Sequence, residues 1–555
     1  MVANISTTVS PCAGNPSLKV DSVRALPLVR VHTRREKTDT ETSTLRFSQS
    51  GEDLQRLPSS TAADVLRALP AVWVRSLGGY GTATTVGTRG LSATHTAVMV
   101  DGFPLGDAES GTVDVARFAP LQLEGLLIDV GGAPELLSPV RALGASTLQF
   151  TTPRRPLRIW TAMGAFGYRS AGGSAHLSTP IGRLGFQLDG KRADNDYPFV
   201  FDNGTMREHR RRTWAQTQSW TPAVRWMTPD RLKVGSGELG IRGHYAQRQL
   251  PGATLLYTVR EGERMDDDET AVHGKWQLRR KTWQWKMAAQ ALFRQKRYED
   301  RDRQYPGGVR QDDYRQREYW FTTGVEHHIS AHWQWAYAMD GTWATLHQTG
   351  QAEREVGRTS LQQALSLRYH RARGSATLRL LRHDFFNTAR NADPTNSGTA
   401  NNVGSFGLQG TAHVFLWRTS ATRVSLRATA QSTFRPPTFA ENYYFRYGNT
   451  QLRNERAQRL NFGLVGAYAV GLWQVQASAD AFADRITDGI VAVPLTPAIW
   501  RTENLDQVRA SGLDVSANVR YARENRTTIA ATGHWLLCRT DRKSTRLNSS
   551  HSGES

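Results

Sequence analysis

The run Trp276-Gln277-Leu278-Arg279 is followed, after three residues, by Trp283-Gln284-Trp285-Lys286-Met287, and this pattern indicates how most of the 555-residue chain folds. Apolar and polar residues alternate in both runs, and residues 280–282 form a polar break between them. Two-residue alternation is typical of a strand with one apolar face, and a short polar break joins two such strands. The stretch therefore predicts an antiparallel hairpin.

The same alternation recurs from about residue 156 onward, without a helical pattern of useful length between the runs. Further examples are residues 239–245, 333–339, 365–369 and 473–477. The joins alternate between tight ones (near 180–183, 280–282, 371–374, 417–420, 469–471 and 522–525) and long polar ones (near 192–212, 247–268, 297–315, 386–404, 432–456 and 485–506). Short turns at one rim and long loops at the other are typical of an outer-membrane barrel. The sequence therefore predicts a mainly β fold, a transmembrane antiparallel β-barrel.

About seventeen strands precede the end of the alternation, whereas a closed single-chain bacterial barrel has an even number. We therefore expect residues 153–538 to form an incomplete barrel. Residues 539–555 show neither strand alternation nor a terminal aromatic residue, and they resemble translated adapter sequence. We interpret them as a non-native tail, and the alternative is a disordered native tail.

The composition narrows the classes of protein to consider. No apolar run approaches the ~18 residues of a transmembrane helix. Lys and Arg exceed Asp and Glu by 20, but these charges are dispersed, and Arg210, Arg211 and Arg212 form the one tight run. A dispersed excess indicates a solvated face and not a nucleic-acid surface. Cys12 and Cys538 lie near opposite ends and form no disulfide framework.

The region before the barrel has a different sequence pattern. Residues 46–152 predict a small α/β domain with a helix over 61–69 and strands at 71–75, 84–88, 97–100, 124–130 and 146–151. Residues 1–45 are polar and aperiodic, which predicts a flexible arm. The arm contains one short extended patch: Leu28, Val29, Arg30, Val31, His32 and Thr33. No secretory apolar segment precedes residue 40, so we expect the signal peptide to be missing.

Pieces of this α/β region resemble, in order, the plug domain of TonB-dependent outer-membrane receptors. The matching pieces are residues 63–75, Thr88-Arg89-Gly90, and residues 98–105 with Asp101, Gly102 and Pro104, followed by Gly111 and Asp114. Where the family has Arg-Gly-Pro, this chain has Gly132-Ala133-Pro134, and the closing double glycine is Gly144-Ala145. These departures indicate a divergent branch.

The barrel region carries a second resemblance to the same receptors. Residues 434–441, which read Phe-Arg-Pro-Pro-Thr-Phe-Ala-Glu, precede Tyr447-Gly448-Asn449, Leu452 and Glu455. Residues 486–490, Asn504 and residues 511–514 continue the likeness in the family's order. Together the two resemblances span about residues 45–520.

The resemblance implies a barrel of about 22 strands in the complete protein, with the plug in its lumen, in the bacterial outer membrane. Outer-membrane lipid and lipopolysaccharide would surround a monomeric barrel. The partner TonB, with its inner-membrane energising complex, would bind a TonB box in the N-terminal arm by strand addition. Leu28, Val29, Arg30, Val31, His32 and Thr33 are the candidate TonB box.

The function implied is energised uptake of a large, scarce solute. A ferric siderophore, another iron complex or cobalamin is favoured as the metal-chelate ligand; glycans, other chelates and a passive porin or adhesin are the alternatives. We expect no enzyme, because the chain has no Gly-x-x-x-x-Gly-Lys-Ser/Thr loop, Gly-x-Ser-x-Gly elbow or His-Glu-x-x-His helix. We also expect no nucleic-acid partner.

Candidate ligand-binding residues lie in two of the long loops, where aromatic rings and a cation could hold a planar or anionic complex. They are Tyr197, Phe199, Phe201, Tyr443, Tyr444 and Arg446. The alternative is a self-packing loop or an interfacial aromatic girdle. Asp194, Asp196 and Asp202 are candidates for a loop Ca²⁺ site, and no other cofactor is expected.

Overall fold

The computed structural model describes residues 43–56, 59–76, 80–143, 146–202, 204–229, 234–250, 262–301, 306–350, 353–391, 398–444, 447–494, 500–523 and 526–543. The candidate TonB box (residues 28–33), Gly144-Ala145, Arg446 and most of the tail after residue 539 lie outside the described residues.

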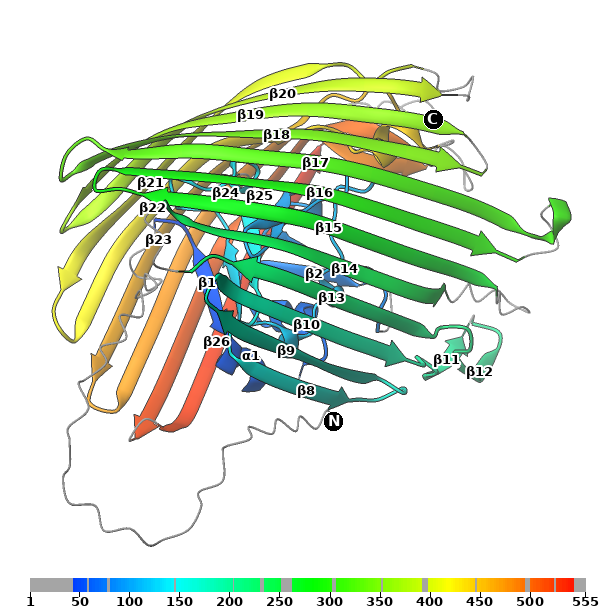
Figure 1. The fold of residues 1–555 in the computed structure, drawn as a ribbon, viewed down its shortest axis with the longest axis horizontal. Coiled ribbons are helices and arrows are strands. Elements are labelled where there is room, and N and C mark those ends of the chain that lie inside the picture. Colours follow the sequence, from blue (N-terminus) through cyan, green and yellow to red (C-terminus); the bar gives the residue numbers. More distant parts are fainter. Residues whose placement is uncertain are drawn as a thin grey trace, which may run out of the picture.

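In the described part of the chain, seventeen strands form one large barrel sheet (Figure 1). The strands are β8 (Leu157–Met163), β9 (Arg169–Thr179), β10 (Gly182–Ala193), β13 (Thr217–Met227), β14 (Ser236–Leu250), β15 (Glu263–Arg279), β16 (Trp283–Asp300), β17 (Arg310–His328), β18 (Trp333–Thr349), β19 (Arg354–Arg371), β20 (Gly374–Asn391), β21 (Val403–Arg418), β22 (Thr422–Arg435), β23 (Glu455–Val470), β24 (Trp473–Pro494), β25 (Trp500–Arg523) and β26 (Arg526–Lys543).

Residues 153–538 are expected to stop before the barrel closes, whereas the strand order in the structure is that of a closed barrel. The strand order is circular, because β26 is followed by β8 and β9. The sixteen pairs that connect β8 to β26 through the sheet are antiparallel, so β8 and β26 run in the same direction.

The hairpin predicted from residues 276–287 is confirmed. Trp276 pairs with Met287 and Arg279 with Gln284 across the turn between β15 and β16. Among the apolar side chains of these strands, Val272, Trp283, Trp285 and Phe293 are exposed, whereas Leu292 is buried. On the outer face Phe406 is 76% exposed, which is typical of a lipid-facing surface and not of a soluble sandwich.

The tight joins are confirmed at residues 180–181, 280–282, 372–373, 419–421 and 471–472. Two expected long loops are wrong in extent: β14 and β15 extend into residues 247–268, and β24 and β25 occupy most of residues 485–506. Asp266, Asp267 and Asp268 consequently lie inside β15. In these residues apolar and polar side chains no longer alternate, although the backbones of neighbouring strands still pair. Strand lengths predicted from alternation are therefore too short.

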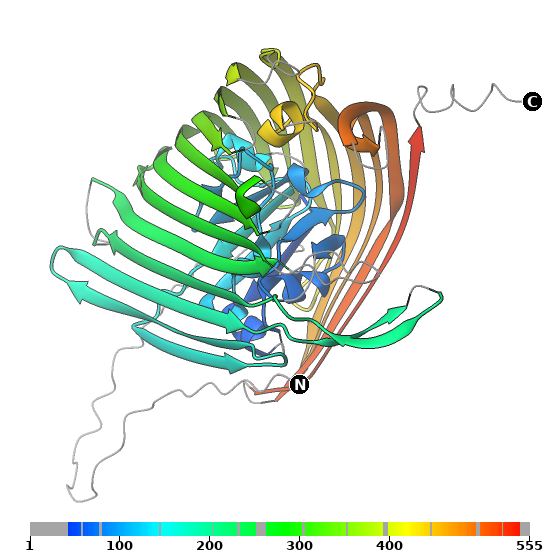
Figure 2. The same cartoon turned by 90° about the vertical axis from the view of Figure 1, so that its right-hand side faces the viewer.

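An inner domain, residues 43–152, lies within the ring of barrel strands (Figure 2, blue to cyan). Its five-stranded sheet has the order β1-β6-β7-β4-β5, and β2 and β3 pair separately. The elements are β1 (Arg46–Ser50), α1 (Gly51–Arg56), α2 (Ala62–Arg67), β2 (Val72–Ser76), β3 (Thr84–Thr88), η2 (Ala93–His95), β4 (Thr96–Val100), β5 (Phe103–Leu105), η3 (Val115–Arg117), η4 (Pro120–Gln122), β6 (Gly125–Asp129), η5 (Val140–Leu143) and β7 (Ser146–Thr151).

The expected helix over residues 61–69 is α2, which a capping box between Thr61 and Asp64 begins. The expected strands correspond to β2, β3, β4, β6 and β7. The sequence analysis missed β1, α1 and β5. Leu66, Phe103 and Phe150 are among the fully buried core residues. None of the helices in the described residues combines the length and the apolarity needed to cross a membrane.

Three further elements lie at the barrel rims: the hairpin of β11 (Pro198–Asp202) and β12 (Arg207–Arg211), the short helix α3 (Phe439–Tyr443) between β22 and β23, and the turn η6 (Pro306–Gly308). They fall in three of the long joins expected from the sequence.

Candidate functional site: the contact between inner domain and barrel

Arg89, one of the sequence-predicted plug residues, binds the barrel wall. Its Nε donates to Asp514 Oδ2 on β25 at 2.7 Å, and its guanidinium lies 4.3 Å from the centre of the Phe482 ring. The two charged side chains are 2% and 3% exposed. Burial lowers the pKa of Arg89, and Asp514 opposes that shift. Gly90 is required next to it, because a Cβ there would clash with Ala510.

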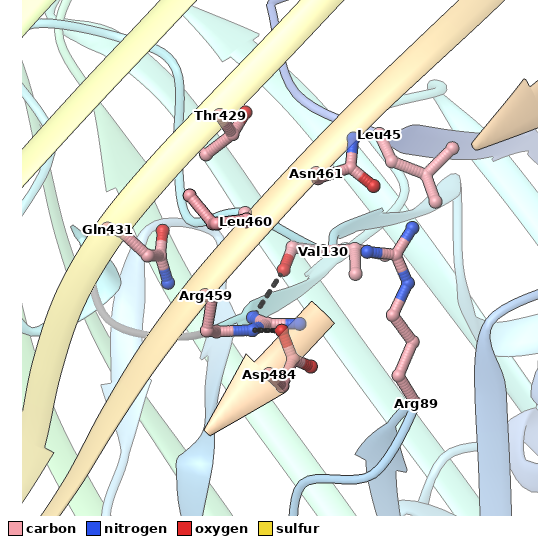
Figure 3. A pocket seen from close by; sticks show the side chains of 10 residues that line it. Leu45, Arg89, Val130, Thr429, Gln431, Arg459, Leu460, Asn461 and Asp484 are labelled. Carbon is pink, nitrogen blue, oxygen red and sulfur yellow. Dashed lines mark hydrogen bonds and ion pairs between the residues drawn. The ribbon is translucent and has the colours of Figure 1, made fainter. Parts of the chain in front are cut away.

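Arg89 also lines a small pocket together with Val130, Arg459 and Asp484 (Figure 3). On the barrel side Arg459 binds both Asp484, at 3.2 Å, and the backbone carbonyl of Val130, at 2.8 Å. Beside it Arg427 binds Asp480. Three buried carboxylates on β24 and β25 are thus each matched by an arginine, two from the barrel and one from the inner domain.

Asp101 and Gly102 form the turn between β4 and β5, with positive φ angles of 53° and 87° that favour glycine at the second position. Asp101 accepts hydrogen bonds from the backbone N–H and hydroxyl of Thr152 and from Arg225, at 3.1, 2.5 and 3.4 Å. Burial raises the pKa of Asp101, but Arg225 and Lys275 outweigh it, and the net shift is downward. Pro104 follows on β5, and its carbonyl accepts from Gln290 at 2.9 Å.

Basic side chains of the wall hold the inner domain mainly by its backbone. Among the described residues, nine of them, on nine different strands, donate to backbone carbonyl oxygens of residues 43–152. They are Arg158, Lys191, Arg242, Lys275, Arg294, Arg368, Arg379, Arg427 and Arg459. The interpretation of the positive charge as a solvated face is therefore wrong for these residues, because they face a protein-filled lumen.

The turn around Asp107 contacts α3 and strand β16. Lys296 Nζ lies 2.8 Å from both Asp107 and Glu109, and Tyr444 donates its hydroxyl to Glu109. Burial raises the pKa of Asp107, but Lys296 and Arg294 lower it more, to about 2. Burial and then Glu109 raise the pKa of Tyr444.

The late-barrel motif forms a second cluster against the inner domain. Glu455 contacts His95 of the inner domain and accepts from Arg435, which also binds Glu441. Thr438 caps α3 by accepting from the Glu441 N–H at 3.2 Å. The two motifs also meet at Gly111, whose missing Cβ would lie 2.6 Å from the Thr438 methyl group. These contacts place the motif residues against the inner domain.

The structure separates the two groups of predicted ligand-binding aromatics. Tyr443 is buried and accepts from the Ala400 N–H, and Tyr444 faces Glu109. Phe199 and Phe201 lie in the β11–β12 hairpin at the rim, where Arg212 and Arg210 cover their rings at 5.1 and 4.2 Å. Tyr197 precedes this hairpin and packs edge-on against Phe166.

The calcium candidates do not converge. Asp196 binds Arg211, Asp194 accepts from Gln216, and Asp202 accepts from the Gly204 N–H. Within the described ranges no group of three or more His, Cys, Asp or Glu side chains is placed to hold a metal ion.

Sequence reasoning missed His95, Glu269 and the carbonyl-binding arginines, and also Glu318, which accepts a hydrogen bond from Arg141 of the inner domain at 3.2 Å. His95 and Glu455 lie 360 residues apart, and Arg117 reaches Glu269 across 152 residues. A single sequence carries no signal for such pairs, since local periodicity does not report which distant strands become neighbours.

Family models match both regions of the chain: that of the TonB-dependent receptor plug domain matches residues 37–145, and that of the TonB-dependent receptor-like β-barrel matches residues 161–550. Among curated proteins, the vitamin B12 transporter BtuB of Photobacterium profundum is 32% identical over 127 residues, 22% of this chain and 20% of that protein. BtuB of Vibrio vulnificus is 35% identical over 72 residues, 13% and 12% of the two chains. The match thus spans a fifth or less of these relatives.

Solved structures of low sequence identity share the fold. The copper transporter OprC has a TM-score of 0.70 at 13% identity, covering 91% of this chain and 82% of that one. The ferric citrate transporter FecA has a TM-score of 0.69 at 12% identity, covering 91% and 79%. At these identities the likeness concerns the fold alone.

Proposed function

The chain belongs to the TonB-dependent receptor family, and on that premise we propose that it takes up a large, scarce solute across the bacterial outer membrane with energy supplied through TonB. The family and fold are those of transport receptors, which are not enzymes. We favour a ferric siderophore, another iron complex or cobalamin as the solute. Glycans and other chelates, taken up by the same mechanism, are the alternative.

One observation carries the proposal: the inner domain occupies the lumen and is bound to the wall by buried charged groups. A hydrogen bond to a charged group contributes ~1.5–3 kcal/mol, whereas thermal energy is only ~0.6 kcal/mol. The nine carbonyl-binding side chains and the Arg89–Asp514 pair therefore oppose spontaneous opening. A passive porin would need an open lumen, so transport through this barrel requires work on the inner domain.

The choice of solute is supported by relatives and by the rim. The partial relatives are named as vitamin B12 transporters, and the fold neighbours include copper and ferric citrate transporters. We propose that Tyr197, Phe199, Phe201 and Arg446 contact the solute; the support for the first three is that they lie in or beside the β11–β12 hairpin in a long connection between barrel strands. We assign the partner-binding TonB box to residues 28–33.

Growth of a receptor-deleted Gram-negative host tests this function. The host carries the full chain or a variant lacking residues 28–33, and it grows on limiting ferric siderophore or limiting cobalamin. A variant lacking residues 15–20 is the matched control for shortening the arm. Rescue that is lost only in the first variant supports energised uptake and identifies the ligand class.

Rescue that survives loss of residues 28–33 would contradict the proposed TonB box. Absence of rescue on both nutrients would contradict the proposed solutes and favour glycans or other chelates.

A further inference from the structure

Four tight turns of the barrel lie in a row along one rim (Figure 1, left side). They connect β15 to β16, β17 to β18, β19 to β20 and β21 to β22, and these eight strands are consecutive neighbours in the sheet. Backbone hydrogen bonds of 2.8–2.9 Å link each turn to the next, and they join Thr282 to His328, His332 to His370, and Arg373 to Phe415. The four turns therefore form one continuous surface.

The charged side chains of this surface are basic. Six of them are exposed and lie in or beside the turns, and we call them the basic rim: Arg279, Arg280, Lys281, Arg371, Arg373 and Arg418. Residues 279–283, 328–333, 371–374 and 418–422 contain no Asp or Glu. The nearest carboxylate along the chain, that of Glu326, lies 3.5 Å from His328. The turns themselves thus carry positive charge without compensating negative charge.

The opposite rim, that of the long connections, differs in having paired cations. Three pairs there have N···O distances of 2.6–2.9 Å, and they are Arg264–Asp266, Arg301–Glu299 and Arg310–Asp312. The side chains of Lys281, Arg371 and Arg373 in the basic rim form no ion pair with any residue that the structure describes. These cations are therefore available to a negative partner outside the chain.

Exposed tryptophans indicate the depth of the basic rim in the membrane. On β16 the side chains that bind the inner domain, Gln290 and Arg294, occupy even positions, so Trp283 and Trp285 at odd positions point outward. With Trp333 at the start of β18, they are 42–45% exposed and lie directly beside the turns. Aromatic girdles mark the membrane–water interfaces of such barrels, and the short turns face the periplasm. The basic rim therefore lies at the headgroups of the periplasmic leaflet.

We propose that the basic rim binds the headgroups of anionic phospholipids in the periplasmic leaflet. A headgroup phosphate is an oxyanion that arginine and lysine bind through charge-assisted hydrogen bonds. Clusters of basic residues beside a membrane surface attract anionic lipids. Eight neighbouring strands at a spacing of ~4.8 Å span roughly 34 Å, so the rim can contact several headgroups at once. The inference goes beyond the proposed function, because it concerns the lipid around the barrel and not the transported solute.

Quenching of tryptophan fluorescence by brominated lipids tests the proposal. The purified full chain in mixed detergent micelles is titrated with phosphatidylglycerol or phosphatidylcholine, both with the same brominated acyl chains. The variant carries Lys281→Gln, Arg371→Gln and Arg373→Gln. We expect the wild type to bind phosphatidylglycerol at least about threefold more tightly than phosphatidylcholine, and we expect this preference to disappear in the variant.

The matched control carries Arg297→Gln, Arg315→Gln and Arg317→Gln, which removes three exposed cations from β16 and β17 near the opposite rim. The net charge falls by the same amount as in the variant, so the control should keep the wild-type preference. Equal loss of preference in the control would overturn the proposal, because the lipid would then respond to the total charge of the protein and not to the basic rim.

Two further results would overturn the proposal: equal quenching by the two lipids in the wild type, and an unchanged preference in the variant. A second variant, with Lys281→Arg, Arg371→Lys and Arg373→Lys, keeps the charge and guards against a folding defect. It should keep the preference for phosphatidylglycerol, and loss of the preference there would also overturn the proposal.

Discussion

Arg89→Ala would leave Asp514 buried without its arginine. Removing one partner of a buried ion pair costs about 3–5 kcal/mol, because the remaining charge stays desolvated. Chemical denaturation should show a loss of that size in the free energy of unfolding of the inner domain. Arg67→Ala is the control, since its pair with Asp64 is 48% and 35% exposed and is worth at most ~1 kcal/mol. Equal effects of the two substitutions would contradict the assigned role of Arg89.

Asp107 makes the contact between the inner domain and Lys296 of the barrel wall sensitive to acid. Its pKa falls from 3.8 to about 2 in the folded state. A carboxyl group with a lowered pKa contributes stability that is full above pH ~4 and is lost as the pH falls toward 2, here about 2 kcal/mol. The free energy of unfolding, measured from pH 5 to 2, should therefore fall less steeply in Asp107→Asn. Asp202→Asn, at the exposed hairpin, serves as the control, and identical pH slopes for the wild type and Asp107→Asn would sink the idea.

Among the elements, β26 differs from the other long strands in having a short neighbour on one side. β26 has 18 residues and β8 has 7, so at least 18 − 7 = 11 residues of β26 have β25 as their one sheet neighbour. In these residues of β26, the N–H groups that point away from β25 have no neighbouring strand to bind. We expect faster amide hydrogen exchange in β26 than in β17, which pairs with β16 and β18 along its length. Equal protection of β26 and β17, measured by mass spectrometry, would contradict the one-sided pairing.

The elements were largely predictable from the sequence, while their extents were not. The β15–β16 hairpin, the tight turns and α2 follow from alternation, polar breaks and caps, which are properties of neighbouring residues. The upper ends of β14 and β15 were missed, because polar residues such as Asp266 occupy them while the backbone pairing continues. Pairing depends on the adjacent strand, which the local pattern does not contain.

At the scale of the whole molecule, the nine carbonyl-binding basic side chains face the inside of the barrel and bind the inner domain. Arg379 donates to the carbonyls of Ala133 and Glu135, and Arg368 donates to that of Pro134. These contacts use the backbone and so tolerate changes of side chain. Because the barrel binds backbone carbonyls here, the plug segment can keep its position although the side chains of Gly132-Ala133-Pro134 depart from the family pattern.

By itself, the sequence determined the class of fold, the alternation of turns and loops, and the two motifs, because each depends on residues close together in the chain. Only the tertiary structure decided that β26 stands next to β8 in the strand order and that Arg89 binds Asp514. Arg89 and Asp514 are 425 residues apart, and which face of a strand meets the inner domain depends on the closed ring as a whole. Long-range contacts of this kind leave no local pattern from which they could be deduced.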